Sequence, residues 1–354
     1  MDSKFTKLSK GCQLCQQGTW LCIYLTYKCS ASCHFCPSPF KDDRIHSSFG
    51  NTKEEIIIYL SKSEMKGISF SGGDPFLVYN RLLEWLTFFN NKLFDYYYWV
   101  YTNGTHVNEQ KLKALAEEGM HEIRFNIAAT DYLSPEIWRQ IEYARKHFQF
   151  VTIEIPSIRK DFEKLRKALH MAYDIGIDFI NLHDYIISPE NIQTEEEALD
   201  EFILNMSFAI HYSRASIENT YAIKEYSQHN DFSFNINHCS LQQKEEQLWQ
   251  RRLKTGAMFD NPLYDHWTDD GLIYNYFLFP SEFNSERMEA ILIDTEMENR
   301  SENYMLSKNE IDNWHQQDET MKLVQATYIP KMDVNGNKLL IDWQINYALR
   351  QAHL

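Results

Sequence analysis

The sequence predicts an α/β protein built around a parallel β-sheet. Two observations predict this class. Between residues 20 and 185, apolar or β-branched runs of strand length alternate with amphipathic segments of helix length. After Tyr185 the alternation stops, and a length of 354 residues suits one enlarged domain with an appended region. We therefore expect a large α/β core followed by a smaller C-terminal part.

Six strand-like segments make up the alternating part. The first, Trp20–Thr26, is a continuous apolar run, as in a parallel strand buried on both faces. Because strands separated by helices pair in parallel through right-handed crossovers, the six predict either an open doubly wound sheet or an incomplete barrel. Periodicity alone does not choose between them. The other five segments are Gly67–Ser71, Tyr96–Tyr101, Glu122–Ile127, Phe150–Ile155 and Phe179–His183.

Helices are predicted between these strands. Thr52 can cap a helix that contains Ile56–Leu60, because two acidic residues follow it in the first turn. Pro135 stands in the first turn of the predicted helix Ser134–Lys146, where proline is tolerated. The remaining helices are expected at Leu77–Asn90, Asn108–Glu118 and Phe162–Tyr173.

Residues 186–354 are predicted to form a smaller α+β region. Two amphipathic helices are expected there, Thr194–Tyr212 and Gln242–Lys254. Turn residues flanked by strand-like runs predict hairpins at 269–271 and 333–336. The polar, acidic stretch 296–319 is expected to be a solvated helix or loop. The expected organisation is an N-terminal segment (1–19), a core (20–185) and this C-terminal region (186–354).

The composition restricts the function classes. A net charge of −15 argues against a general nucleic-acid or anionic-membrane surface, although it leaves room for a local basic pocket. No apolar run is long enough for a membrane span, and residues 1–10 lack the apolar centre of a signal peptide. The seven cysteines are clustered, which fits metal binding better than a secreted disulfide framework. A reducing, cytoplasmic location is expected.

Three cysteines, Cys29, Cys33 and Cys36, follow the first strand. A cysteine with partners at both +4 and +7 arises by chance about 0.003 times in a chain of this cysteine content, so the spacing carries information. A buried group of free thiols and a structural zinc site are the alternatives, but zinc needs four ligands and only three cysteines are local. Three thiolates on a 4Fe–4S cluster leave one iron open to a substrate or cofactor.

At this point the chain resembles the radical S-adenosylmethionine (SAM) superfamily, whose defining motif Cys29-x₃-Cys33-x₂-Cys36 matches. The resemblance covers about residues 20–185 and implies a partial (β/α)₆ barrel with the cluster loop after the first strand. It implies a 4Fe–4S cluster whose open iron binds SAM. One electron then cleaves SAM to methionine and a 5′-deoxyadenosyl radical, which takes hydrogen from a substrate. Phe35, just before the last cysteine, would shield the cluster and lie near the adenine.

The second motif is Ser71-Gly72-Gly73-Asp74-Pro75, one strand–helix unit after the cysteines. Glycines let the backbone approach a ligand closely, and a carboxylate can accept hydrogen bonds from an ammonium group. The resemblance implies that Ser71, Gly72, Gly73 and Asp74 bind the methionine end of SAM. The family more often has glutamate where Asp74 stands, so the backbone carbonyls of Ser71–Gly73 could make the contact instead. Taken alone, the motif is also a common turn.

Further candidates stand at the carboxyl ends of the later strands, where ligand-facing groups gather in a barrel-like sheet. By resemblance Thr102 and Asn103 end the third strand, Asn126 contacts the ribose, and Arg124 pairs with the SAM carboxylate. Polar residues that cap a strand or satisfy a loop are the alternative for each. Candidates for the substrate pocket are Glu154–Pro156 and Asn181–Asp184, which include Asn181 and His183.

The remaining cysteines offer a second, weaker metal pattern. Cys12-x₂-Cys15 has a spacing that arises by chance about 0.14 times in such a chain. With Cys239 it could hold an auxiliary iron–sulfur cluster, or zinc with His238 as fourth ligand. Reduced structural thiols are the alternative, and Cys22, inside the first strand, is expected in the core.

The sequence therefore predicts a radical SAM enzyme, an oxidoreductase or lyase, that acts on an unidentified substrate, with a small molecule preferred. It needs a one-electron donor such as flavodoxin or ferredoxin, and no membrane partner is expected. Three alternatives stay open: a protein resembling the activases of glycyl-radical enzymes, a nucleic-acid-modifying member of the superfamily, and a zinc-stabilised binding module.

Overall fold

The computed structural model describes residues 7–36, 41–47, 49–187, 199–203, 209–256, 262–269, 271–293, 304–312, 320–332 and 338–345. The chain forms two compact units, residues 1–47 with 51–248, and residues 48–50 with 249–354. The main division falls after Leu248, later than the boundary at 185/186 expected from the sequence. None of the helices in the described ranges is long and apolar enough to cross a membrane.

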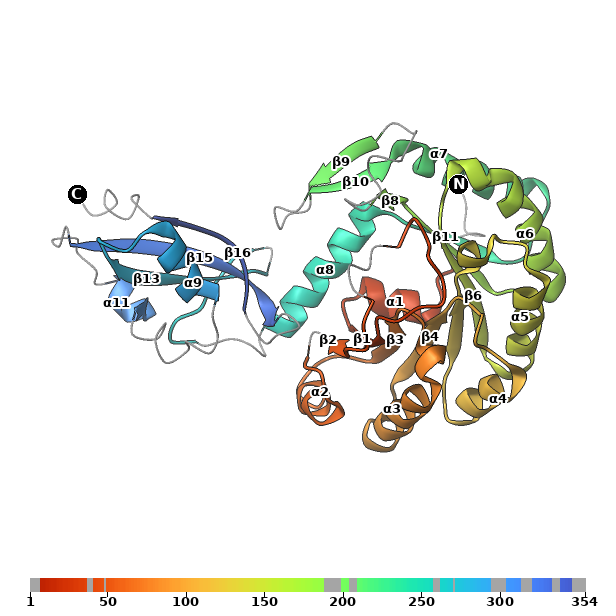
Figure 1. Cartoon of the computed structure of the whole chain (residues 1–354), viewed down its shortest axis with the longest axis horizontal. Coiled ribbons are helices and arrows are strands. Elements are labelled where there is room, and N and C mark those ends of the chain that lie inside the picture. Colours follow the sequence, from red (N-terminus) through yellow and green to blue (C-terminus); the bar gives the residue numbers. More distant parts are fainter. Residues whose placement is uncertain are drawn as a thin grey trace. The chain divides into compact units, whose positions relative to one another are not determined.

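The first unit is organised on an eight-stranded sheet (Figure 1). Seven strands are parallel and β2 pairs antiparallel with β1. The sheet is open, with β11 at one edge and β2 at the other, so the strands curve without closing into a barrel. The order is β11 (Asn235–Cys239), β7 (Phe179–His183), β6 (Phe150–Pro156), β5 (Glu122–Phe125), β4 (Tyr97–Thr102), β3 (Gly67–Gly72), β1 (Trp20–Thr26) and β2 (His46–Ser47).

All six strands expected from the alternation are present and parallel, which confirms the partial (β/α)₆ architecture. The sequence did not predict β11, although Phe232, Phe234 and Ile236 alternate with polar residues, which is a strand signal. This strand extends the sheet beyond β7 with a parallel register that pairs Cys239 with His183. The extra strand matters for the site because it brings a distant cysteine to the sheet.

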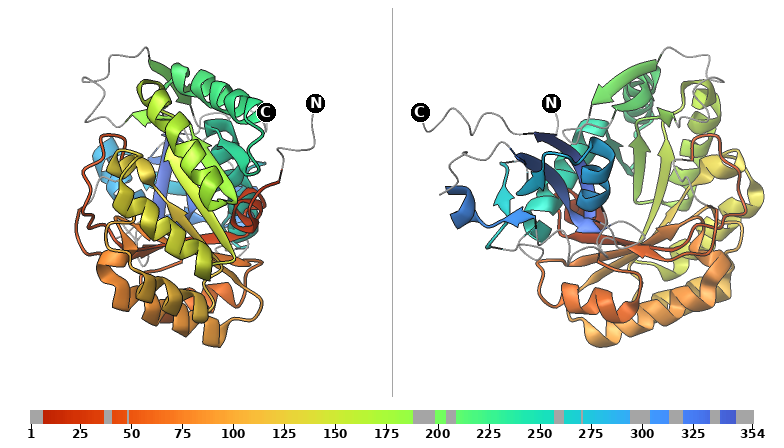
Figure 2. Two further views of the ribbon diagram at one scale, coloured as in Figure 1. Left: turned by 90° about the vertical axis from the view of Figure 1, so that its right-hand side faces the viewer. Right: turned by 60° about the vertical axis from the view of Figure 1, so that its left-hand side comes forward.

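The helices between the strands lie on the outer face of the sheet (Figure 1, Figure 2). Their buried positions follow a helical spacing, as at Ile137, Ile141 and Ala144 in α5. The helix α2 begins with a capping box between Thr52 and Glu55. The helices are α2 (Lys53–Leu60), α3 (Tyr79–Lys92), α4 (Glu109–Glu117), α5 (Pro135–His147), α6 (Phe162–Ile175) and α7 (Arg214–His229). Short 3₁₀ turns precede or follow them at η1 (Pro75–Val78), η2 (Ile127–Thr130) and η3 (Arg159–Asp161).

A short N-terminal helix, α1 (Lys10–Gln16), lies on the opposite, inner face of the sheet (Figure 1). Ser9 caps it by accepting a hydrogen bond from the Cys12 N–H at 3.2 Å. Its contacts are with β1, β3 and β4, and Leu14 is buried against them. This helix was not predicted, because it is short and Gly11 lowers its intrinsic helix propensity.

The segment after β7 corrects one prediction. The long helix expected at Thr194–Tyr212 is wrong where the structure describes it: β9 (Leu199–Ile203) and β10 (Ala209–Ser213) are antiparallel strands. Residues 194–198 and 204–208 lie outside the described residues. The strand β10 also pairs with β8 (Ile186–Ile187). Pairing with a partner outside the segment overrides the local helix preference of the glutamate-rich stretch.

Where the structure describes it, the second unit contains an antiparallel sheet and short helices, as the α+β expectation requires. Its core is aromatic and aliphatic, with Phe277, Phe279, Met288 and Val324 almost fully buried. The strands that flank both predicted hairpins pair antiparallel, whereas residues 270 and 333–337 themselves lie outside the described residues. The elements are β12 (His266–Trp267), β13 (Ile273–Pro280), α9 (Ser285–Ile293), β14 (Met305–Leu306), α11 (Lys308–Asp312), β15 (Met321–Met332) and β16 (Lys338–Ile345), and they follow α8 (Leu241–Gly256).

Candidate active site

A cavity at the carboxyl ends of the central strands brings most of the predicted site residues together. It encloses about 540 Å³, and Cys29, Cys33 and Cys36 of the loop after β1 line it. Cys29 and Cys36 are exposed, Cys33 is half-buried, and all three are free thiols. Phe35 also lines the cavity, where it packs beside the buried Tyr185.

The chemistry of these thiols suits a metal cluster. Burial raises the pKa of the Cys33 thiol to about 11 and also raises the pKa of Cys29. At Cys29 two donors oppose this effect, because Sγ accepts hydrogen bonds from the Ala31 N–H at 3.4 Å and from Asn103 Nδ2 at 3.5 Å. Metal binding would deprotonate such thiols. Three thiolates are a soft donor set of the kind that iron–sulfur clusters take.

The number of local thiols fits a cluster with one open iron. Cys29, Cys33 and Cys36 supply three ligands, as a 4Fe–4S cluster with one open iron requires, whereas a structural zinc site takes four. Among the described residues, no group of three or more His, Cys, Asp or Glu side chains is arranged to hold a single metal ion.

Two glycines hold the cysteine loop against the end of β3. Gly73 donates its N–H to the Thr26 carbonyl at 2.7 Å. A Cβ added to Gly72 would lie 1.9 Å from the Thr26 oxygen, and one added to Gly73 would lie 1.9 Å from the Lys28 oxygen. Gly72 also has a φ of +128°, which side chains rarely adopt. Only glycine at both positions therefore lets the two strand ends meet beside the cavity.

The Asp74 carboxylate is occupied within the protein. It is fully buried and accepts hydrogen bonds from the Phe76 N–H at 2.9 Å, Thr102 Oγ1 at 3.1 Å and the Asn103 N–H at 3.2 Å. Burial raises the pKa of this carboxyl group. Ser71, Gly72 and Gly73 line the cavity, so the backbone of the motif, rather than the Asp74 side chain, faces a ligand. Asp74 ties the end of β3 to the end of β4.

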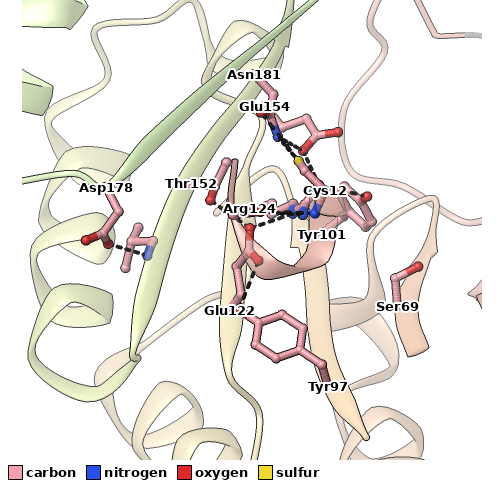
Figure 3. Close-up of polar contacts among 12 residues, drawn as sticks. Cys12, Ser69, Tyr97, Tyr101, Glu122, Arg124, Thr152, Glu154, Asp178 and Asn181 are labelled. Atoms are coloured by element: carbon pink, nitrogen blue, oxygen red, sulfur yellow. Dashed lines mark hydrogen bonds and ion pairs between the residues drawn. The ribbon is translucent and has the colours of Figure 1, made fainter. Parts of the chain in front are cut away.

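Arg124 lies at the centre of a buried charge network on the cavity wall (Figure 3). It is 3% exposed, and its Nε and Nη1 lie 2.8 Å from carboxylate oxygens of Glu122 and Glu154 respectively. Its guanidinium also lies over the rings of Trp99 and Tyr101, at 5.2 and 5.4 Å from their centres. The cation that the sequence assigned to the SAM carboxylate is thus already paired with two carboxylates.

The network continues from Glu154 to the next strand. Glu154 Oε1 lies 2.8 Å from His183 Nε2, and Glu154 Oε2 accepts a hydrogen bond from Asn181 Nδ2 at 2.9 Å. Although burial opposes ionisation, Arg124 and His183 hold the pKa of Glu154 well below its usual range. Against the opposing effect of burial, Cys239 and Glu154 raise the pKa of His183 to about 9. At neutral pH the pair is therefore a carboxylate and an imidazolium.

Other candidate residues lie at the carboxyl ends of the strands, as the sequence predicts. Thr102, Asn103 and Asn126 line the cavity, and Asn126 also accepts a hydrogen bond from the Ala129 N–H at 3.3 Å. Asp184, within the predicted candidates Asn181–Asp184, lines the cavity as well. The sequence did not identify Tyr101 or Lys244, which also line it. Lys244 belongs to a later helix, and no local pattern marks it.

The other cysteines gather on the inner face of the sheet. Cys12 Sγ accepts a hydrogen bond from Asn181 Nδ2 at 3.3 Å, and the Cys15 thiol donates to Gln247 Oε1 at 3.1 Å. Cys239 pairs in register with His183, which lowers the pKa of the Cys239 thiol against the opposing effect of burial. His238 does not join them, since its Nε2 lies 2.6 Å from Asp184 Oδ1.

A protein of Methanocaldococcus jannaschii, named as a candidate glycyl-radical enzyme activating enzyme, is 28% identical over 310 residues, or 84% of this chain and 81% of that protein. Streptococcus suis SuiB bound to S-adenosylmethionine is 12% identical with a TM-score of 0.47, over 64% of this chain and 53% of that one. The structure of anSMEcpe with bound AdoMet and a Cp18Cys peptide is 16% identical with a TM-score of 0.44, over 61% and 62%. The chain thus spans about half the length of the SuiB chain.

The family comparison covers the core described above. Residues 23–202, just over half of the 354 residues, match the Radical SAM superfamily. The matched stretch contains the three-cysteine loop, the glycines after β3 and the network around Arg124. The chain belongs to the radical SAM superfamily.

Proposed function

We propose that this protein uses one electron to cleave SAM, and that the resulting 5′-deoxyadenosyl radical takes a hydrogen atom from a small polar substrate held in the same cavity. Members of this superfamily use a 4Fe–4S cluster and SAM, which supply that radical chemistry. The observation that carries the proposal is one cavity that has three free thiols on one side and buried charged groups on the other.

The cofactor side of the cavity is formed by two loops. Cys29, Cys33 and Cys36 would hold the cluster, and the backbone of Ser71–Gly73 would face the methionine end of SAM. Asn103 supports the cluster loop, because its Nδ2 donates to Cys29 Sγ at 3.5 Å and to Ser30 Oγ at 3.3 Å. Donors aimed at a ligand sulfur orient it and lower its electron density. Asn126 also lines the cavity, and it is the residue that we expect to contact the ribose of SAM.

The substrate side carries charges of both signs. Glu154, His183, Asp184 and Lys244 all line the cavity. Glu154 and His183 are paired with each other, whereas Lys244 is half-buried and acts on Asp184 through its charge. Such a wall suits a ligand with its own polar or charged groups. An apolar ligand would cover the polar side chains of the wall without pairing with them, which is unfavourable. This supports a small polar molecule as the substrate.

A protein substrate is the second candidate. The relative from Methanocaldococcus jannaschii is named as a candidate activating enzyme of a glycyl-radical enzyme and matches 84% of this chain. An activase would take hydrogen from a glycine of its partner rather than from a small molecule. A nucleic-acid substrate receives less support, because the net charge is −15. A zinc-stabilised binding module receives less support still, since no described residues converge on one ion.

The electron source and compartment follow from the chemistry. Reductive cleavage consumes one electron for each SAM, so a low-potential donor such as flavodoxin or ferredoxin would be the partner. All seven cysteines are free thiols, which favours a reducing, cytoplasmic compartment.

The test is anaerobic reconstitution followed by reduction with dithionite in the presence of SAM. We expect 5′-deoxyadenosine from the wild type and only background from Cys33→Ala. Cys22→Ala is the matched control, because Cys22 lies on β1 but does not line the described cavity. Absence of 5′-deoxyadenosine from the iron-loaded wild type would refute the proposal.

The same assay distinguishes a small-molecule substrate from a protein substrate. Small-molecule and protein fractions of a cell extract are added in turn, and the rate of 5′-deoxyadenosine release is compared with the rate without substrate. Stimulation by the small-molecule fraction supports the first candidate. Stimulation by the protein fraction alone, with a glycyl radical detected by electron paramagnetic resonance, supports the activase.

A further inference from the structure

Three cysteines outside the catalytic loop meet although they are far apart in the sequence. Cys12 and Cys15 are three residues apart on α1, so they lie on one side of that helix. Cys239 ends β11, the strand that extends the sheet beyond β7. Cys12 Sγ accepts a hydrogen bond from Asn181 of β7, and the Cys15 thiol donates one to Gln247 of α8, the helix that directly follows β11. The helix α1 therefore holds both thiols at the part of the sheet where Cys239 lies.

The position of α1 is fixed by close packing rather than by chance contact. A Cβ added to Gly11 would lie 2.5 Å from Arg124 Nη2 and 3.0 Å from Glu122 Oε2. Ser9 Oγ also accepts a hydrogen bond from Arg124 Nη2 at 3.2 Å. The helix is therefore seated directly on the buried charges of the sheet, and this holds both of its cysteines on the inner face.

A histidine completes the group, and it is His183 rather than His238. In the parallel register of β11 and β7, Cys239 stands opposite His183, and each of the two side chains shifts the pKa of the other. His238 points to the other face, where Asp184 holds it. Nε2 of His183 is held by Glu154 at 2.8 Å, so Nδ1 is the nitrogen that would bind a metal, and the metal would displace its proton. A carboxylate on the far nitrogen is the usual arrangement of a metal-bound histidine.

The surroundings of the group also suit a metal centre. Cys12 is buried, and Asn181 Nδ2 donates to its sulfur at 3.3 Å while donating to Glu154 at 2.9 Å (Figure 3). Buried thiols with aimed donors are well placed as ligands. Three cysteines and one histidine are a donor set that iron–sulfur clusters take, since histidine replaces cysteine as a ligand in some of them.

We propose that Cys12, Cys15, Cys239 and His183 hold a second iron–sulfur cluster on the inner face of the sheet. Unlike Cys29, Cys33 and Cys36, this set supplies four protein ligands, so it leaves no iron open. It shares His183, and Glu154 bonded to it, with the wall of the active-site cavity. The proposal does not depend on the proposed function, because its ligands do not include Cys29, Cys33 or Cys36.

The experiment removes the catalytic cluster first. In the triple variant Cys29→Ala/Cys33→Ala/Cys36→Ala, reconstituted without air, we expect about four irons and four sulfides per chain, against about eight of each in the wild type. Adding Cys12→Ala and Cys15→Ala, or Cys239→Ala, should reduce the iron to background. Adding Cys22→Ala is the matched control and should leave it unchanged. Circular dichroism of each variant checks that the fold is retained.

Two results would overturn the assignment. One is a folded triple variant with iron at background, and the other is a triple variant with one zinc per chain and no sulfide. The histidine is tested separately, by pulsed electron paramagnetic resonance of the reduced triple variant. We expect a nitrogen coupling that disappears in His183→Cys while the iron content is kept. A coupling that is absent from the start would overturn the role of His183. None of these readouts uses SAM cleavage, so a failure of the proposed function remains distinguishable.

Discussion

Acidic and basic side chains at the site are joined in one network. Glu122, Arg124, Glu154 and His183 follow one another as acid, base, acid and base, with 2.8 Å between the atoms of each neighbouring pair. Burying a charge is expensive, and breaking such a network leaves an unpaired ion. The sequence marked Arg124 and Glu154 separately, because both stand near strand ends. It did not pair them, because the pairing depends on β5 and β6 being neighbours, which no local pattern shows.

Asp74 provides the first prediction at this scale. Asp74→Ala removes the acceptor for Thr102 Oγ1 and for the N–H groups of Phe76 and Asn103. Each donor left unsatisfied costs about 1–3 kcal/mol, so we expect the free energy of unfolding to fall by about 3 kcal/mol or more. Asp74→Asn keeps an acceptor oxygen and should lose less. Urea denaturation measures both, and equal losses would show that the carboxylate hydrogen bonds are unimportant.

His121 provides a prediction about pH. Its Nδ1 accepts a hydrogen bond from the Tyr98 N–H at 3.1 Å, and burial lowers its pKa below the ordinary 6.5. The unfolded chain therefore binds this proton more readily, so acidification through that range destabilises the fold, by at most about 1.4 kcal/mol per pH unit. At higher pH both states are neutral and the effect disappears.

The measurement for His121 is the free energy of unfolding at neutral and at mildly acidic pH. His121→Asn keeps an acceptor for the Tyr98 N–H but cannot be protonated, so its stability should fall less on acidification than that of the wild type. The hypothesis fails when the two proteins lose the same stability.

At the scale of elements, the regular part of the chain was predictable and the exceptions were not. The six strands of the core and their helices follow from periodicity, because each buries an apolar face locally. The two strands β9 and β10 were predicted as a helix, because their pairing depends on β8 and on each other. The helix α1 was not predicted, because it is stabilised by its packing against the sheet rather than by the helix propensity of its own residues.

The substitution Gly11→Ala tests how closely α1 packs against the sheet. In an exposed helix this change is stabilising by about 0.5–1 kcal/mol, because glycine is the poorer helix former. Here the new Cβ would lie 2.5 Å from Arg124 Nη2, so we expect a loss of about 1–3 kcal/mol from overpacking. Lys10→Ala, at an exposed position of the same helix, is the control and should change stability little. Thermal unfolding gives the sign, and stabilisation by Gly11→Ala would show that α1 is not packed there.

At the scale of the whole molecule, the described residues that we propose to bind the cluster, SAM and the substrate all belong to one of the two units. The loop cysteines, the glycines after β3 and the charge network all lie within residues 1–47 and 51–248. The sequence indicated a change of architecture after Tyr185, but β11 returns to the main sheet, so the contacts divide the chain later. A boundary of this kind depends on which distant strand completes a sheet, and composition does not show it.

Ligand binding should therefore stabilise the two units unequally. SAM at about 100 times its dissociation constant should stabilise the first unit by about 2.7 kcal/mol, because it binds the folded form. Hydrogen exchange measured peptide by peptide on the cluster-loaded protein separates the two units. We expect SAM to slow exchange in β1, β3 and β4, with no change in β13 and β15. Equal protection of both sheets would argue against a binding site confined to the first unit.

The long-range contacts of α1 also bear on the order in which the nascent chain folds. Translation releases α1 before β7 and α8, yet its cysteines are hydrogen-bonded to residues 169 and 232 positions further along. Domains made on the ribosome usually fold from the N-terminal side. Here α1 can make these contacts only after β7 and α8 have been synthesised. We therefore expect the thiols of Cys12 and Cys15 to be exposed to oxygen and to metal ions until that point in synthesis.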